Sequence, residues 1–137
     1  MNEVVFKLND DTVSANEVNT LYALIGWNTL NQRTEARTAS ILRTSAAYAT
    51  ARSDSGLIGF GRILGDAYTA QILDVMTAPE CRKRGVATQF IRLLLDWSGD
   101  RFLGISLIDG TRNPAFHERL GFTAADPESD RLMYWQP

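Results

Sequence analysis

The stretch between two predicted strands, residues 68–78 and 102–108, constrains the fold of this chain more than any other. It begins at Pro79, which ends the first strand, and continues as a polar loop with three consecutive basic residues and a glycine. Apolar side chains at helical spacing then predict an amphipathic helix over residues 86–97. A strand, a helix and a second strand in this order predict a right-handed βαβ unit with two parallel strands.

The loop before this helix is typical of an anion-binding site. The N-terminus of a helix presents free N–H groups and a partial positive charge. Gly85 lets the backbone approach a ligand closely, and the small Ala87 leaves room for it. The loop lacks the glycine spacing of P-loops and of dinucleotide-binding folds. We therefore predict that the loop binds an anion, the alternative being a solvated basic helix start.

An antiparallel meander precedes this unit in the chain. Turn residues separate predicted strands at residues 46–52, 57–64 and 68–78. Ser14 and Glu17 have the spacing of a capping box at the start of a first helix. The other predicted elements are a strand at residues 4–8, helices at about residues 32–45 and at residues 114–120, and closing strands at residues 122–124 and 132–135. The predicted order is β-α-α-β-β-β-α-β-α-β-β, so the predicted fold class is α+β with a mixed sheet.

The composition excludes several classes of protein. The 137 residues fit one domain, which we place at residues 1–137. A formal net charge of −2 argues against a nucleic-acid partner, and no stretch approaches the roughly 20 apolar residues of a membrane span. The single cysteine, Cys81, cannot form an internal disulfide, which favours a reducing, cytoplasmic location. One histidine and no clustered cysteines predict no metal site.

Two segments of the sequence resemble signatures of the GNAT superfamily of N-acetyltransferases. The segment PECRKRGVA at residues 79–87 is similar to the loop that binds the pyrophosphate of acetyl-CoA, and NPAFHERLGF at residues 113–122 to a late strand-to-helix segment. The resemblance covers most of the chain and is strongest over residues 56–122. It implies a three-layer α/β arrangement with helices on both faces of a mixed sheet. It also implies an acyltransferase that moves an acetyl group from acetyl-CoA to a primary amine by direct transfer.

The resemblance further implies which residues bind acetyl-CoA. Backbone amides of residues 82–87 would hold the pyrophosphate, and the strand at residues 75–77 would pair with the pantetheine arm. A β-bulge in this strand would free an amide that polarises the thioester carbonyl. The implied cofactor-binding residues are Val75, Met76, Thr77, Arg82, Lys83, Arg84, Gly85, Val86, Ala87 and Asn113.

His117 and Asp74 are the candidate catalytic residues. His117 stands where the family commonly has Tyr, which is thought to protonate the departing CoA thiolate, and an imidazole also donates a proton near neutral pH. The alternative is a His117 that only packs or hydrogen-bonds beside the cofactor. Asp74 would take the proton of the amine directly or through water. The alternative is an Asp74 tied to the backbone or to a neighbouring arginine.

Trp27 and Arg62 are the candidate residues for the acceptor. Trp27 follows the first helix, where the family's acceptor-binding segment usually lies, although a packed aromatic is the alternative. Arg62 would face an acidic acceptor, or else pair with Asp66. The expected partner is a small-molecule amine, with a protein amine as an alternative acceptor. A non-catalytic acyl-CoA-binding or regulatory module and a protein-interaction domain are the competing functions, and the resemblance allows for a homodimer.

Overall fold

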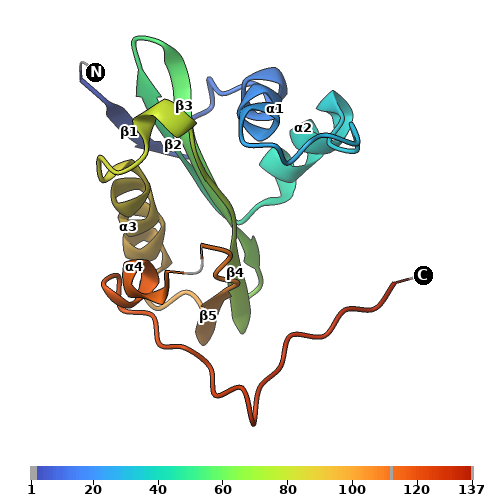
Figure 1. Cartoon of the computed structure of the whole chain (residues 1–137), viewed down its shortest axis with the longest axis vertical. Coiled ribbons are helices and arrows are strands. Elements are labelled where there is room, and N and C mark those ends of the chain that lie inside the picture. The colour runs from blue at the N-terminus through green and yellow to red at the C-terminus, as the bar shows by residue number, and fades with distance from the viewer. Residues whose placement is uncertain (1–2, 112, 137) are drawn as a thin grey trace.

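The computed structural model describes residues 3–111 and 113–136, and a twisted sheet runs through the middle of the molecule (Figure 1). The strands are β1 (Val5–Leu8), β2 (Ala47–Ser53), β3 (Gly56–Gly65), β4 (Thr69–Thr77) and β5 (Gly104–Leu107). The α-helices are α1 (Ala15–Leu24), α2 (Glu35–Thr44), α3 (Val86–Ser98) and α4 (Pro114–Glu118), and a short 3-10 turn, η1 (Pro79–Cys81), precedes α3.

The strands lie in the sheet in the order in which they occur in the chain, β1-β2-β3-β4-β5. Neighbouring strands from β1 to β4 are antiparallel, whereas β5 is parallel to β4. The helix α3 connects β4 to β5. The predicted mixed sheet, its antiparallel meander and its βαβ unit are therefore confirmed.

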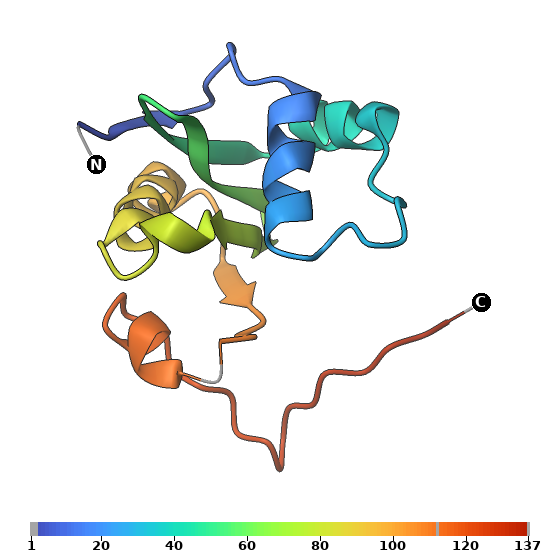
Figure 2. The same cartoon turned by 45° about the horizontal axis from the view of Figure 1, so that its top comes forward.

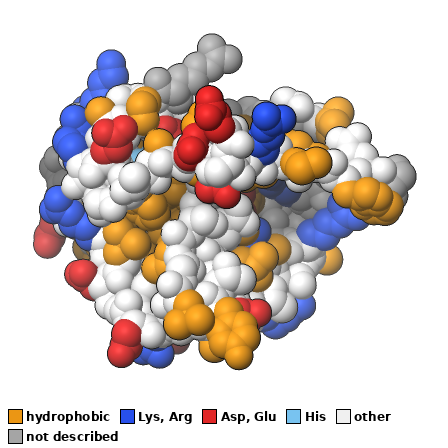
Figure 3. Space-filling model, turned by 90° about the horizontal axis from the view of Figure 1, so that it is seen from below, with side chains coloured by type: hydrophobic (Ala, Val, Ile, Leu, Met, Phe, Trp, Pro, Cys, Tyr) orange, Lys and Arg blue, Asp and Glu red, His pale blue; other side chains and the backbone are white. Residues whose placement is uncertain are grey.

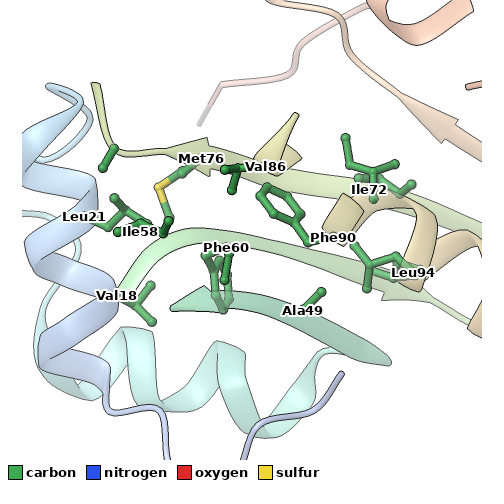
Figure 4. Packing of buried hydrophobic residues seen from close by; sticks show 14 of the residues in the cluster. Val18, Leu21, Ala49, Ile58, Phe60, Ile72, Met76, Val86, Phe90 and Leu94 are labelled. Carbon is green, nitrogen blue, oxygen red and sulfur yellow. The ribbon is translucent and has the colours of Figure 1, made fainter. Parts of the chain in front are cut away.

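The helix α3 packs against one face of the sheet, where two glycines of β3 make room for an aromatic ring. A Cβ atom added to Gly59 would lie 2.8 Å from Cε1 of Phe90, and one added to Gly61 would lie 3.0 Å from Cε2 of the same ring. Real Cβ atoms rarely come this close to another atom, so the ring of Phe90 occupies space that a side chain at either glycine would fill. Phe90 and Leu94 are fully buried at this contact (Figure 4).

The helices α1 and α2 lie on the other side of the sheet, next to each other (Figures 1 and 2). The helix α1 buries Val18, Leu21 and Tyr22 against β3 and β4, and the view in Figure 4 shows Val18 and Leu21 at this contact. Helices on both faces of the sheet are therefore confirmed. None of the helices within the described ranges is long and apolar enough to cross a lipid bilayer.

Side-chain caps set where α1 and α2 begin. The hydroxyl of Ser14 accepts a hydrogen bond from the backbone N–H of Glu17, and the carboxylate of Glu17 accepts one from the backbone N–H of Ser14, both at 3.1 Å. This confirms the predicted capping box. The hydroxyl of Thr34 accepts from the backbone N–H of Arg37, so α2 begins after Thr34, a little later than the predicted residue 32.

The two predicted closing strands are wrong. Residues 122–136 form neither helix nor strand, and this tail leads away from the sheet beyond α4 (Figures 1 and 2). The side chains of Leu132, Met133, Tyr134 and Trp135 are 57–84% exposed. An extended segment becomes a strand only where a sheet edge lies within hydrogen-bonding reach, and the tail does not return to the edge of β5.

Candidate functional site

The strands β4 and β5 separate and leave a cavity between them. Their parallel pairing ends at Ile72 and Leu107, whereas β4 continues to Thr77. The cavity has a volume of about 930 Å³. Its walls come from the second half of β4, the loop before α3, the first turn of α3, the loop after β5, and α4. Backbone groups in this half of β4 therefore face a cavity where a neighbouring strand would otherwise lie.

The start of α3 forms an anion cradle at one end of the cavity, made by residues 82–88. Gly85 is the N-cap residue and has a φ of +76°, in the left-handed region that favours glycine. No side chain caps the helix, and a Cβ atom added to Gly85 would meet no atom within 4 Å. The N–H groups of the first turn are thus left for a ligand.

Positive charge surrounds the cradle. Arg82 and Lys83 are exposed and line the cavity, and the guanidinium of Arg82 donates a hydrogen bond of 3.3 Å to the carbonyl of Thr77. Viewed from below, basic side chains gather along the left edge of the molecule, the side on which α3 and α4 lie in Figure 1 (Figure 3). The chain as a whole has a net charge of −2, so this concentration of positive charge is local.

A β-bulge interrupts β4 beside the cavity. Met76 pairs with Phe60 and Leu73 pairs with Arg62, so Asp74 and Val75 together lie opposite a single residue of β3. Asp74 has a φ of +55°, which is uncommon for a residue other than glycine. The implied bulge is therefore confirmed. It turns the backbone of β4 locally and leaves an unpaired residue at the wall of the cavity.

Asp74 is held by an arginine of the neighbouring strand. The Nε atom of Arg62 donates a hydrogen bond of 2.6 Å to Oδ2 of Asp74, and both side chains are largely buried. Tyr22 lies beside this pair. Burial, together with the negative charge of Asp74, raises the pKa of Tyr22 to about 12, so its hydroxyl is protonated at neutral pH.

His117, in α4, also lines the cavity. It is 8% exposed and packs edge-on against Phe116 and Phe122, with ring centroids 4.9 and 6.1 Å away. Its Nδ1 atom lies 3.4 Å from Oδ1 of Asp109 and has no hydrogen-bond partner in the described part of the chain. Hydrogen bonds from Thr111 hold the pKa of Asp109 below its usual range. The carboxylate of Asp109, on the loop after β5, thus lies next to the Nδ1 side of the imidazole.

The comparison with known families decides the kind of protein. A model of the acetyltransferase (GNAT) family matches residues 13–122, which is more than half of the chain. This chain belongs to the GNAT acetyltransferase family. No curated protein matches its sequence.

Solved structures share the fold of this GNAT chain at low sequence identity. A protein of Staphylococcus aureus superposes with a TM-score of 0.81 at 18% identity, covering 97% of this chain and 100% of its own. A GNAT-family acetyltransferase of Streptococcus pneumoniae superposes with a TM-score of 0.80 at 18% identity, covering 98% of both chains. An aminoglycoside acetyltransferase from an uncultured soil sample gives a TM-score of 0.71 at 16% identity and covers 99% of both.

The GNAT fold brings most of the candidate residues to one cavity. The candidates that line it are Trp27, Asp74, Val75, Met76, Thr77, Arg82, Lys83, Gly85, Val86, Ala87, Asn113 and His117. Arg84 is exposed and does not line it. Arg62 lines a separate, smaller cavity, and its partner is Asp74 rather than Asp66. Among the residues that the structure describes, no group of His, Cys, Asp and Glu side chains could hold a metal ion.

Sequence reasoning missed Asp109. The signal was available, because Asp109 follows directly on a predicted strand and precedes the segment that contains His117. A carboxylate at the end of a strand commonly faces the site that the neighbouring loops form.

Proposed function

We propose that this chain is an N-acetyltransferase that moves an acetyl group from acetyl-CoA to a primary amine of a small molecule by direct transfer. One observation carries the proposal: the bulge in β4, the anion cradle of α3 and His117 of α4 all border a single cavity. A phosphorylated acyl carrier needs an anion site at one end and a polarising group at the other. This cavity has candidates for both.

The residues of the cradle fit the phosphates of acetyl-CoA. The uncapped first turn of α3 offers backbone N–H groups, and Arg82 and Lys83 add positive charge next to them. When bound, acetyl-CoA supplies an acetyl group activated as a thioester. The backbone of β4 from Leu73 to Thr77 has no partner in β5, so it can pair with an extended ligand as a strand would.

The residues around the bulge and on α4 would serve the transfer itself. An unpaired N–H at the bulge would polarise the thioester carbonyl while the amine nitrogen forms its bond to the carbonyl carbon. The C–S bond breaks, and His117 would donate the proton that the leaving sulfur takes up. The proton that the amine loses would pass to Asp74 or to water. Because Arg62 already holds Asp74, water at the bulge is the simpler acceptor for this proton.

Binding and turnover test the proposal separately. Acetyl-CoA should raise the unfolding temperature of the chain, because a ligand that binds only the folded state stabilises it. Mixing with a panel of amines should then release CoA, measured with a thiol reagent. Binding without CoA release from any amine would point to a non-catalytic acyl-CoA-binding module instead. Absence of binding at millimolar acetyl-CoA would overturn the assignment of the cavity.

A pair of glycine variants tests the cradle. Gly85→Val places a side chain in the open space at the start of α3 and should weaken acetyl-CoA binding about tenfold or more by calorimetry. Gly56→Val is the matched control, since Gly56 also has a positive φ, of +109°, a Cβ atom there also meets nothing within 4 Å, and Gly56 lies outside the cavity wall. Equal affinities of the two variants would contradict the cradle.

The proposal also includes the cellular setting. A cytoplasmic location suits the single thiol of Cys81, which is buried. We propose no nucleic-acid or membrane partner, and a homodimer is the assembly to test by sedimentation at micromolar concentration.

A further inference from the structure

A second, smaller cavity adjoins the larger one at the bulge of β4. Its volume is about 230 Å³, and it lies between the sheet and the helices α1 and α2. Asp74 lines both cavities, so the two lie next to each other at this residue. A molecule with its amine beside Asp74 thus has the smaller cavity next to it for its other end.

The wall of the smaller cavity carries an excess of positive charge. Three arginines, Arg33, Arg37 and Arg62, line it together with a single carboxylate, that of Asp74. Arg62 pairs with this carboxylate at 2.6 Å. Within the described ranges, neither Arg33 nor Arg37 has a carboxylate within 4.0 Å. Two guanidinium groups thus face the cavity without an anionic partner from the chain.

Contacts with the protein hold both guanidinium groups in place. Arg33 stacks on the ring of Tyr22, 4.6 Å from its centroid, and its Nη1 donates a hydrogen bond of 2.6 Å to the carbonyl of Trp27. The Nη1 atom of Arg37 donates one of 2.9 Å to the carbonyl of Gln32. A guanidinium has five N–H donors, so each group keeps donors for a ligand. Because these contacts restrict the two side chains, a ligand loses less side-chain entropy when it binds them than it would with unrestrained arginines.

We propose that the acceptor is a primary amine that also carries an anionic oxyacid group, such as a carboxylate or a phosphate, and that Arg33 and Arg37 bind this group. This inference rests on the proposed function and names its substrate class. Guanidinium groups bind carboxylates and phosphates through paired hydrogen bonds. In the reaction the nitrogen gains the acetyl group and loses a proton, and the anionic group is unchanged.

Matched acceptors test the inference on the whole chain. CoA release is measured with glycine and glycinamide, with 2-aminoethyl phosphate and ethanolamine, and with a diamine. The anionic member of at least one pair should have a kcat/KM about tenfold or more above that of its uncharged partner. The carboxylate and phosphate pairs show which oxyacid is preferred. Equal rates within both pairs, or a preference for the diamine, would overturn the inference while leaving the acetyltransferase intact.

Variants then assign the effect to the two arginines. Arg37→Gln should raise the KM for the anionic acceptor about tenfold and leave the KM for acetyl-CoA unchanged. Arg43→Gln is the matched control, because Arg43 is exposed on the same helix and does not line the cavity. Arg33→Gln should act in the same way, with its unfolding temperature measured because the side chain also stacks on Tyr22. An Arg37→Gln enzyme with unchanged kinetics toward the anionic acceptor would contradict the inference. CoA release from no amine at all would instead overturn the proposed function.

Discussion

The carboxylate of Asp10 provides a quantitative test of what holds this fold together. Its side chain is 1% exposed. The carboxylate accepts hydrogen bonds from the backbone N–H and the hydroxyl of Thr12, at 3.0 and 2.6 Å, and from Nε of Arg52 at 3.0 Å. Burial alone would raise the pKa of Asp10, but these hydrogen bonds and the charge of Arg52 outweigh it and lower the pKa from 3.8 to about 2.

This lowered pKa has a calculable effect on stability. A carboxyl group whose pKa is lower in the folded than in the unfolded chain stabilises the folded state wherever it is ionised in both. The difference between 3.8 and about 2 corresponds to about 2 kcal/mol of unfolding free energy at neutral pH. The contribution is complete above about pH 5, falls to about 1 kcal/mol at pH 3, and is lost as the pH falls below 2.

The test compares the pH dependence of stability in two variants. Urea unfolding is measured from about pH 7 to about pH 3 for the native chain, for Asp10→Asn and for Asp11→Asn. Asp11 is the matched control, because it is the exposed neighbour of Asp10. Between these pH values the native chain should lose about 1 kcal/mol more than Asp10→Asn, and Asp11→Asn should follow the native chain. Parallel curves for the native chain and Asp10→Asn would refute the reasoning.

Gly59→Val should lower the free energy of unfolding by about 1–3 kcal/mol, because the valine side chain would clash with the ring of Phe90. An unchanged midpoint of urea unfolding would show that the ring has room to move. Asp109→Asn should lower kcat about tenfold with little change in the KM for acetyl-CoA, because the carboxylate lies next to Nδ1 of His117. A kcat equal to that of the native enzyme would show that Asp109 has no role in the reaction. Deleting residues 132–137 should change the free energy of unfolding by less than about 0.5 kcal/mol, because the side chains of residues 132–135 are exposed. A large fall in the unfolding temperature would mean that the tail packs against the molecule.

The helices and the first five strands were predictable because their signals are local. The capping box at Ser14 and the apolar spacing of α3 depend on residues three or four positions apart. The tail was not predictable from such patterns. Its run of apolar and aromatic residues at 132–135 favours a strand, but a strand also needs a partner edge, and no local pattern shows where the chain will run after α4.

The partner of Arg62 shows the same limit within the site. Asp66 is only four residues away in the sequence, but it lies in the turn after β3 and accepts hydrogen bonds from the backbone N–H groups of Tyr68 and Thr69. Asp74 is twelve residues away and reaches Arg62 because the strands are antiparallel and the bulge shifts their register. The bulge itself was implied by the family resemblance alone. Nothing in the local sequence requires a left-handed backbone at an aspartate.

The packing of α3 has a consequence for how specificity in this fold can change. The ring of Phe90 rests on Gly59 and Gly61, one helical turn from the cradle, so the core of the sheet supports the proposed donor end of the cavity. The proposed acceptor residues lie on α2 and the loop before it, across the sheet. Substitutions at residues 32–37 can therefore reshape the proposed acceptor end without moving α3. The sheet separates the two halves of the enzyme, and a new acceptor can be selected or engineered while the donor site stays as it is.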